Sequence, residues 1–107
     1  GAGAVIVRMW RGIVRSELLE EYAEIVERTG LAESRRTPGN RGAQLLTRDL
    51  GEGRSELITL SWWDSLDDVR AFAGDDIAVA KYYPEDDPYL LDRDETVVHY
   101  RVGEPGR

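Results

Sequence analysis

Runs of apolar residues along the chain predict strands in four places. Residues 4–14 are rich in β-branched and aromatic side chains and lack helical spacing, which is typical of a strand. Residues 43–50 and 54–63 are two further strand-like runs, and the intervening Gly51, Glu52 and Gly53 are typical of a hairpin connection. Residues 96–102 predict a last strand.

Two helices are predicted where apolar residues recur three and four positions apart. We expect the first to begin at Ser16 as N-cap and to end at Gly30, and the second to run from Ser65 as N-cap to Gly74. The apolar stripe of the first helix consists of Leu18, Leu19, Tyr22, Ile25 and Val26.

The remaining segments are predicted to be irregular or short. Residues 31–42 contain Pro38 and several glycines, which favours a loop over a second long helix. Residues 75–83 predict one or two further helical turns that stop at Pro84. The acidic stretch Glu85-Asp86-Asp87-Pro88 then predicts an exposed loop.

The element order βαββαβ predicts an α+β fold, a ferredoxin-like sandwich in which one antiparallel four-stranded sheet carries both helices on one face. We expect one domain over residues 4–103 and interpret Gly1-Ala2-Gly3 as a processed or engineered end. Large apolar residues lie on both faces of the 54–63 strand, Leu60 and Trp62 on one and Trp63 on the other. The face of the sheet opposite the helices would therefore expose large apolar side chains to solvent. We expect a second copy to bury them in a homodimer that packs sheet against sheet.

Composition excludes several functions. The 107 residues carry 14 Lys and Arg against 21 Asp and Glu, a formal charge of −7, which disfavours nucleic acid and anionic membranes as partners. The absence of cysteine excludes disulfides, thiolate nucleophiles and Cys-based metal sites. No apolar run approaches the length of a membrane-spanning helix and no leader precedes the first strand, so we expect a cytoplasmic protein.

The chain resembles the antibiotic biosynthesis monooxygenase-like family, in particular its small uncharacterised bacterial members. The motifs that carry the resemblance are Trp10-Arg11-Gly12, Thr37-Pro38-Gly39-Asn40-Arg41-Gly42, Leu60-Ser61-Trp62-Trp63-Asp64-Ser65, Phe72-Ala73-Gly74-Asp75, Tyr82-Tyr83-Pro84-Glu85-Asp86-Asp87 and His99-Tyr100. The resemblance implies a dimeric α/β barrel with a pocket in each subunit between the sheet and the helices. Characterised members oxidise polycyclic phenols with dioxygen and no cofactor, cleave haem, or bind small molecules without known chemistry.

Two departures from the family pattern bear on activity. The haem-cleaving members have an Asn on the first strand and a His on the second helix, whereas this chain has neither, and no His lies between Leu66 and Tyr83. Haem is therefore disfavoured. The quinone-forming members have an Asn four residues before the Trp that matches Trp63, and here that residue is Thr59.

The predicted substrate site is a pocket floored by Trp63. Thr59 and Ser61 share its strand face by the two-residue period, and Tyr82 and Tyr83 are placed where a segment covers the pocket mouth. Aromatic rings and hydroxyl donors suit a phenolic or polycyclic ligand. Core and dimer packing is the alternative interpretation of the same aromatic residues, Trp10 and Trp62 included.

His99 is the only histidine and the candidate catalytic base, with a packed core residue as the alternative. Arg8 and Arg11 lie three apart and so point to opposite sides of the first strand. A cation near the pocket could stabilise a developing anion. Ion pairs with the abundant acids are the simpler interpretation of both arginines.

Two functions stay open from the sequence. The first is a cofactor-independent monooxygenase that acts on an electron-rich aromatic small molecule, for which no cofactor and no metal are expected. The second is a non-catalytic dimeric domain that binds a hydrophobic or aromatic small molecule or has a regulatory role. Hydrolase, kinase and dinucleotide-binding motifs are absent from the sequence.

Overall fold

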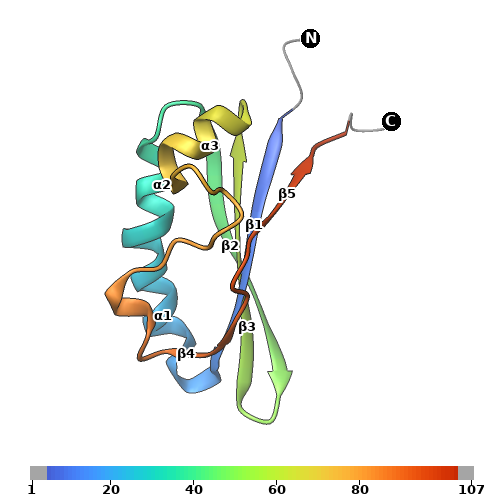
Figure 1. Ribbon diagram of the computed structural model, residues 1–107. Helices are drawn as coiled ribbons and strands as arrows, with labels where there is room; N and C mark the ends of the chain where they lie inside the picture. Colours follow the sequence, from blue (N-terminus) through green and yellow to red (C-terminus); the bar gives the residue numbers. More distant parts are fainter. Residues whose placement is uncertain (1–4, 104–107) are drawn as a thin grey trace.

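The computed structural model describes residues 5–103, so the predictions for Gly1-Ala2-Gly3 and for a strand start at Ala4 lie outside the described residues. The elements are β1 (Ile6–Arg15), η1 (Ser16–Leu18), α1 (Leu19–Val26), η2 (Glu27–Leu31), α2 (Ala32–Arg36), β2 (Asn40–Gly51), β3 (Arg54–Trp63), α3 (Leu66–Ala73), η3 (Pro84–Asp86), β4 (Leu90–Arg93) and β5 (Val98–Arg101). Figure 1 shows the helices packed on one face of the sheet.

Within residues 5–103 the strands form one antiparallel sheet of five strands. Its order is β2-β3-β1, and both β4 and β5 pair with the free edge of β1, β4 near the C-terminal end of β1 and β5 near its N-terminal end. The α+β ferredoxin-like fold predicted from the sequence is confirmed, with one correction. A single last strand was predicted over residues 96–102, and β5 lies within that range, but β4 is a fifth strand that precedes it and was not predicted.

The hairpin and the second helix follow their local sequence signals. β3 has the predicted bounds, and Gly51 and Gly53 adopt positive φ angles in the connection from β2. The hydroxyl of Ser65 caps α3 by accepting a hydrogen bond from the backbone N–H of Asp68 at 3.2 Å. The chain leaves α3 at Gly74, also at positive φ.

The first helix does not end at Gly30, as predicted, but continues to Arg36. Gly30 lies in the π-helical segment η2, and η1, α1, η2 and α2 follow one another without a break. A Cβ atom at Gly30 would lie 3.7 Å from the ring of Tyr83, which is an ordinary contact distance. Ser16 is not an N-cap either, because its hydroxyl shares a 2.7 Å hydrogen bond with the hydroxyl of Ser55 on β3.

Residues 74–97, here called the covering segment, connect α3 to β5 and include η3 and β4. The helical turns predicted for 75–83 are absent, and Val79 instead forms an isolated bridge with Thr96. The carbonyl oxygens of Ile77 and Val79 accept hydrogen bonds from Arg8 on β1, so contacts with the sheet take the place of a helix. The predicted exposed acidic loop is also wrong in part, because Asp86 is buried.

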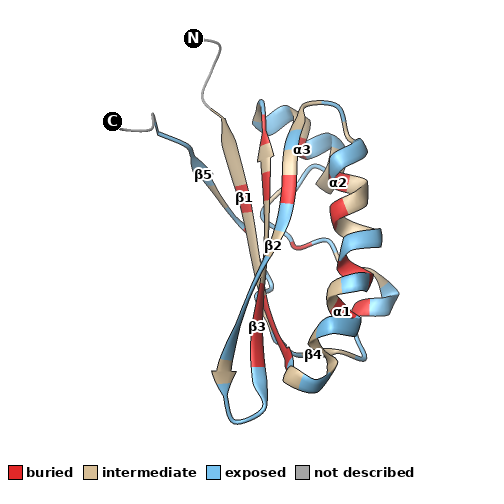
Figure 2. Ribbon diagram, turned by 180° about the vertical axis from the view of Figure 1, so that it is seen from behind, coloured by how far each residue is buried: buried red, intermediate tan, exposed pale blue. Residues whose placement is uncertain are grey.

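The core lies between the sheet and the first helix. It consists of Val14, Tyr22, Ile25, Val26, Leu31, Ala43 and Leu57. Figure 2 shows the buried residues gathered where the helices meet the sheet, and no helix of the described residues lies on the opposite face. None of the helices within residues 5–103 has the length and apolar character to cross a membrane. The expected cytoplasmic location stays a prediction.

Candidate functional site

A cavity of about 70 Å³ lies between the sheet and the helices. Its wall is formed by Arg8, Trp10, Tyr22, Val26, Thr29, Gly30, Leu31, Ser34, Thr59, Ser61, Phe72, Lys81, Tyr82, Tyr83, Asp86 and Val97. This volume is smaller than the roughly 150 Å³ of a closed cavity that binds benzene. The cavity is partly open to solvent, so a single aromatic ring that stays partly exposed suits it better than a fused polycycle.

Arg8 is the most unusual group in this wall. It is only 6% exposed, and none of the ion pairs among the described residues includes it. Nη1 of Arg8 donates to the carbonyl oxygen of Ile77 at 2.7 Å, and Nη2 donates to that of Val79 at 3.5 Å. Burial lowers the pKa of Arg8 to about 10, so it remains a cation at neutral pH.

His99 contacts Arg8 from β5, at the position directly opposite Arg8 in the β1–β5 pairing. Nη1 of Arg8 lies 3.0 Å from Nε2 of His99. Because a guanidinium can only donate, Nε2 must accept, which places the proton of a neutral imidazole on Nδ1. Burial and the charge of Arg8 both lower the pKa of His99. His99 is therefore a neutral partner of Arg8, half-buried and outside the cavity wall.

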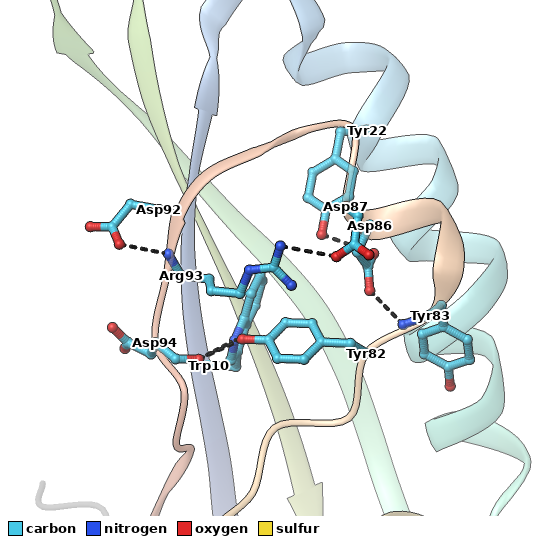
Figure 3. A network of polar contacts seen from close by, with 9 residues as sticks. All are labelled: Trp10, Tyr22, Tyr82, Tyr83, Asp86, Asp87, Asp92, Arg93 and Asp94. Atoms are coloured by element: carbon cyan, nitrogen blue, oxygen red, sulfur yellow. Dashed lines mark hydrogen bonds and ion pairs between the residues drawn. The ribbon is translucent and has the colours of Figure 1, made fainter.

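Asp86 is a second buried charged group of the wall, at the end of η3. The hydroxyl of Tyr22 donates to its Oδ1 at 3.0 Å, and the backbone N–H of Tyr83 donates to its Oδ2 at 2.8 Å (Figure 3). Burial, and then the negative charge of Asp86, raise the pKa of Tyr22 well above its ordinary value. Tyr22 is thus a permanent donor to Asp86, and this pair ties η3 to α1.

Tyr82 and Trp10 join the covering segment to β1. The indole Nε1 of Trp10 donates to the Tyr82 hydroxyl at 2.9 Å, and that hydroxyl donates to the backbone oxygen of Asp94 at 2.6 Å. The two rings meet edge to face at 5.9 Å, and Arg93 lies over the Tyr82 ring at 4.7 Å (Figure 3). Both side chains therefore have structural partners as well as a place in the cavity wall.

A third set of contacts holds the covering segment to α2. The Tyr83 hydroxyl donates to Glu33, and Lys81 pairs with the same carboxylate at 2.5 Å while lying 4.6 Å from the centre of the Phe72 ring. Burial alone would raise the pKa of Glu33, but the hydrogen bonds from Lys81 and Tyr83 outweigh it and lower that pKa. Burial and Glu33 together raise the pKa of Tyr83.

The structure brings four of the predicted substrate-binding residues to this cavity, namely Thr59, Ser61, Tyr82 and Tyr83. Trp63 is not part of the wall: it is completely buried, packs 5.7 Å from Phe72 and donates its indole N–H to Ser61 at 2.8 Å. Trp63 thus lies behind the wall and supports it. The roles of all the predicted substrate-binding residues in binding a ligand stay predictions.

Sequence reasoning missed several contributors to the wall, Phe72 and Lys81 among them. Tyr22 was assigned only to the helix stripe, and Asp86 was placed in a solvated loop. For Arg8 and Arg11 an ion pair was the simpler interpretation and a cation near the pocket the alternative. The ion pair is correct for Arg11, which pairs with Glu56, and wrong for Arg8. Only the two-residue period of β1 pointed to Arg8, because it places Arg8 and Trp10 on the same face.

Within residues 5–103 no group of three or more His, Cys, Asp or Glu side chains is close enough together to hold a metal ion.

Neither a family model nor a curated protein matches the chain. Solved structures do match over nearly the whole length. One, from Bacillus cereus and provisionally described as an antibiotic biosynthesis monooxygenase, has 16% identity and a TM-score of 0.66, with 98% of this chain and 99% of that chain covered.

Two further structures share the fold. SnoaB, a cofactor-independent oxygenase from Streptomyces nogalater, has 16% identity and a TM-score of 0.58, with 97% of each chain covered. MhuD, a haem-degrader from Mycobacterium tuberculosis with two haems in its active site, has 20% identity and a TM-score of 0.62, with 95% of this chain and 99% of that chain covered. The resemblance to the antibiotic biosynthesis monooxygenase-like family is thus confirmed at the level of the fold, and identities this low establish no activity.

Proposed function

We propose that the cavity binds a small electron-rich aromatic molecule and that the protein oxidises this molecule with dioxygen, without a cofactor. The observation that supports the proposal best is the buried cation Arg8 in a wall otherwise rich in aromatic rings. A cofactor-independent oxygenase among the structures with this fold supports the reaction type.

The proposed reaction needs an anionic form of the substrate. A phenolate passes an electron to dioxygen, and the resulting radical and superoxide combine at a ring carbon. For a hydroquinone, one oxygen atom enters the ring and the other leaves as water, so hydroquinone and O₂ give a hydroxyquinone and H₂O. The positive charge of Arg8 would stabilise the phenolate, and the aromatic side chains of the wall would shield the radical pair in part from water.

His99 as the base that forms the phenolate stays a prediction. Its Nε2 accepts a hydrogen bond from Arg8, and the lowered pKa makes His99 a weaker base than an ordinary histidine. Proton uptake at Nε2 would break the contact with Arg8 and place two cations side by side. The substrate proton therefore leaves more readily to solvent than to His99, unless His99 turns.

The same observations favour a second candidate, a non-catalytic domain that binds a small aromatic molecule. Each potential base at the site already accepts hydrogen bonds, His99 from Arg8, and Asp86 from Tyr22 and Tyr83. A wall whose acceptors are occupied in this way is well suited to hold a ligand and poorly suited to move a proton.

An oxygen electrode separates the two functions. We expect uptake above background with single-ring hydroquinones, and no oxygen release when catalase is added at the end, because the second oxygen atom leaves as water. Arg8→Met should lower kcat/KM by roughly 100-fold, the usual effect of removing one stabilising donor. The matched control Arg11→Met, on the same strand but facing the other way, should retain activity. No uptake combined with saturable quenching of tryptophan fluorescence would instead favour the binding domain.

Haem does not fit this site. The histidine nearest the cavity, His99, lies outside its wall with Nε2 bonded to Arg8, and the volume of about 70 Å³ suits one ring rather than a macrocycle. Haem cleavage is therefore not proposed for this chain, although one protein with this fold is a haem-degrader.

We also propose that two copies pair through the face of the sheet opposite the helices. Three side chains on this face are 42–53% exposed despite being large and apolar, namely Leu46, Val98 and Tyr100. Val98 pairs with Met9 and Tyr100 with Val7 on β1, and these two residues pair in turn with Leu60 and Trp62 on β3. Leu46 pairs with Ile58 on β3. Such an apolar surface is typical of an interface, and a second copy of the sheet has the matching shape.

A further inference from the structure

The guanidinium of Arg8 has donors that the protein does not use. Of its five N–H groups, Nη1 uses two, for Ile77 and His99, and Nη2 uses one at the long distance of 3.5 Å, for Val79. No described residue accepts from Nε or from the second N–H of Nη2. No buried side-chain nitrogen lacks a partner among the described residues, so Nε must reach open space, and Arg8 lines the cavity.

The Nε side of the guanidinium is the edge that matches a carboxylate. Nε–H and the Nη2–H beside it point in parallel from one side of the planar group, and a carboxylate can accept both at once. The only described contact that competes for this edge is the long one of 3.5 Å from Nη2 to Val79. The opposite corner, Nη1, is held by a backbone oxygen and by His99. These contacts fix the plane of the guanidinium before any ligand arrives.

Arg8 also lacks an anionic partner among the described residues. Lys81, the other cationic group of the wall, is paired with Glu33, and Asp86 accepts hydrogen bonds from Tyr22 and Tyr83 rather than from Arg8. The backbone oxygens and His99 replace part of the hydration that Arg8 loses on burial, but they carry no negative charge to offset its own. A ligand carboxylate would supply the missing charge.

We propose that Arg8 binds the carboxylate of a single-ring aromatic acid, with the ring placed among the aromatic side chains of the wall. This inference rests on the proposed function for the location of the site and narrows its substrate class to hydroxylated benzoates. The cavity volume of about 70 Å³ favours a ligand with one ring over a fused polycycle. Phe72 supplies an apolar surface beside the cation, since the Arg8 guanidinium lies 5.8 Å from the centre of its ring. His99 is a positioning residue in this arrangement, because it touches Arg8 and not the ligand.

The first test compares two ligands on the unaltered protein by isothermal titration calorimetry. Benzoate and benzamide have the same shape and differ in charge, so we expect benzoate to bind and benzamide to bind at least about tenfold more weakly, as for loss of a charge-assisted pair. Equal affinities, or no binding of benzoate at millimolar concentration, would overturn the proposal. This comparison does not depend on the folding of any variant.

The second test examines whether Arg8 is the cation that recognises the carboxylate of benzoate. Arg8→Met should lose the preference for benzoate, and Arg8→Lys should retain part of it, because an ammonium provides charge without the paired donors. Arg11→Met is the matched control and should bind benzoate like the unaltered protein. Thermal unfolding of each variant checks that it is folded. An Arg8→Met protein that is folded and still prefers benzoate would contradict the assignment.

The third test addresses His99. His99→Phe removes the acceptor at Nη1 and should weaken benzoate binding while leaving benzamide binding unchanged. His99→Gln should restore benzoate binding in part, because its side-chain oxygen can accept from Arg8. A purely structural role would instead affect both ligands equally in both variants.

Failure of this inference is distinguishable from failure of the proposed function. Oxidation of uncharged hydroquinone without benzoate binding would leave the oxygenase and refute the carboxylate site. Benzoate binding that depends on Arg8, without oxygen uptake from 2,5-dihydroxybenzoate, would retain the carboxylate site and refute the oxygenase.

Discussion

Arg8 shows how a side chain takes its role from residues far away in the sequence. Its partners Ile77 and His99 lie 69 and 91 positions along the chain. The sequence places Arg8 on one face of a strand, and only the course of the covering segment decides that no carboxylate reaches it. An arginine on an acidic chain is ordinarily an ion-pair partner, as Arg11 is with Glu56.

His99 should make the stability of the protein depend on pH. Its pKa is lowered in the folded state, by burial and then by Arg8, so the unfolded chain takes up a proton at higher pH than the folded chain does. The contribution of neutral His99 is fully present above about pH 6.5 and is lost as the pH falls below that value. We therefore expect the free energy of unfolding to fall faster between about pH 6.5 and 5 in the unaltered protein than in His99→Gln. Urea unfolding at several pH values measures both slopes, and identical slopes would show that His99 is not shielded as described.

The continuous first helix can be tested at Gly30. Alanine favours a helix over glycine by up to about 1 kcal/mol, and its Cβ would meet Tyr83 at an ordinary contact distance of 3.7 Å. Gly30→Ala should therefore raise the free energy of unfolding by about 0.5–1 kcal/mol. If the helix ended at Gly30 in a left-handed conformation, the same change would destabilise the protein. Urea denaturation distinguishes the two signs.

Helices and strands alone predict only part of the site, because the covering segment supplies the rest. Period-two alternation on β3 suffices to place Thr59 and Ser61 on the helix side. Tyr82 and Tyr83 reach the cavity because long-range contacts hold their segment there, among them those to Trp10, to Glu33 and, through Asp86, to α1. No local pattern encodes those contacts, and for that reason the sequence suggested helical turns and an exposed loop instead.

The proposed dimer is a prediction at the scale of the whole molecule. Tyr100→Glu places a charge on the exposed apolar face of the sheet and should convert a dimer to a monomer, as measured by light scattering after size-exclusion chromatography. Leu66→Glu is the control, since Leu66 is similarly apolar and 38% exposed but lies on α3, on the helix side. A monomeric unaltered protein at micromolar concentration would refute the dimer.

The sequence by itself determined those features that depend on neighbours a few residues apart. The β2–β3 hairpin follows from Gly51 and Gly53, α3 from its Ser65 cap, and the two faces of each strand from alternation. These features arise from backbone angles, local hydrogen bonds and side-chain period, all of which can be read within a short window.

Only the tertiary structure decided the features whose free energy comes from distant contacts. Gly30 lies inside a helix and against Tyr83, Asp86 is buried and accepts a hydrogen bond from Tyr22, and backbone carbonyls and His99 surround Arg8 in place of an acid. The local preference of glycine against a helix is only about 1 kcal/mol, which is small enough for tertiary contacts to outweigh. The cavity consists largely of such contacts, so its chemistry appears only when the chain is folded.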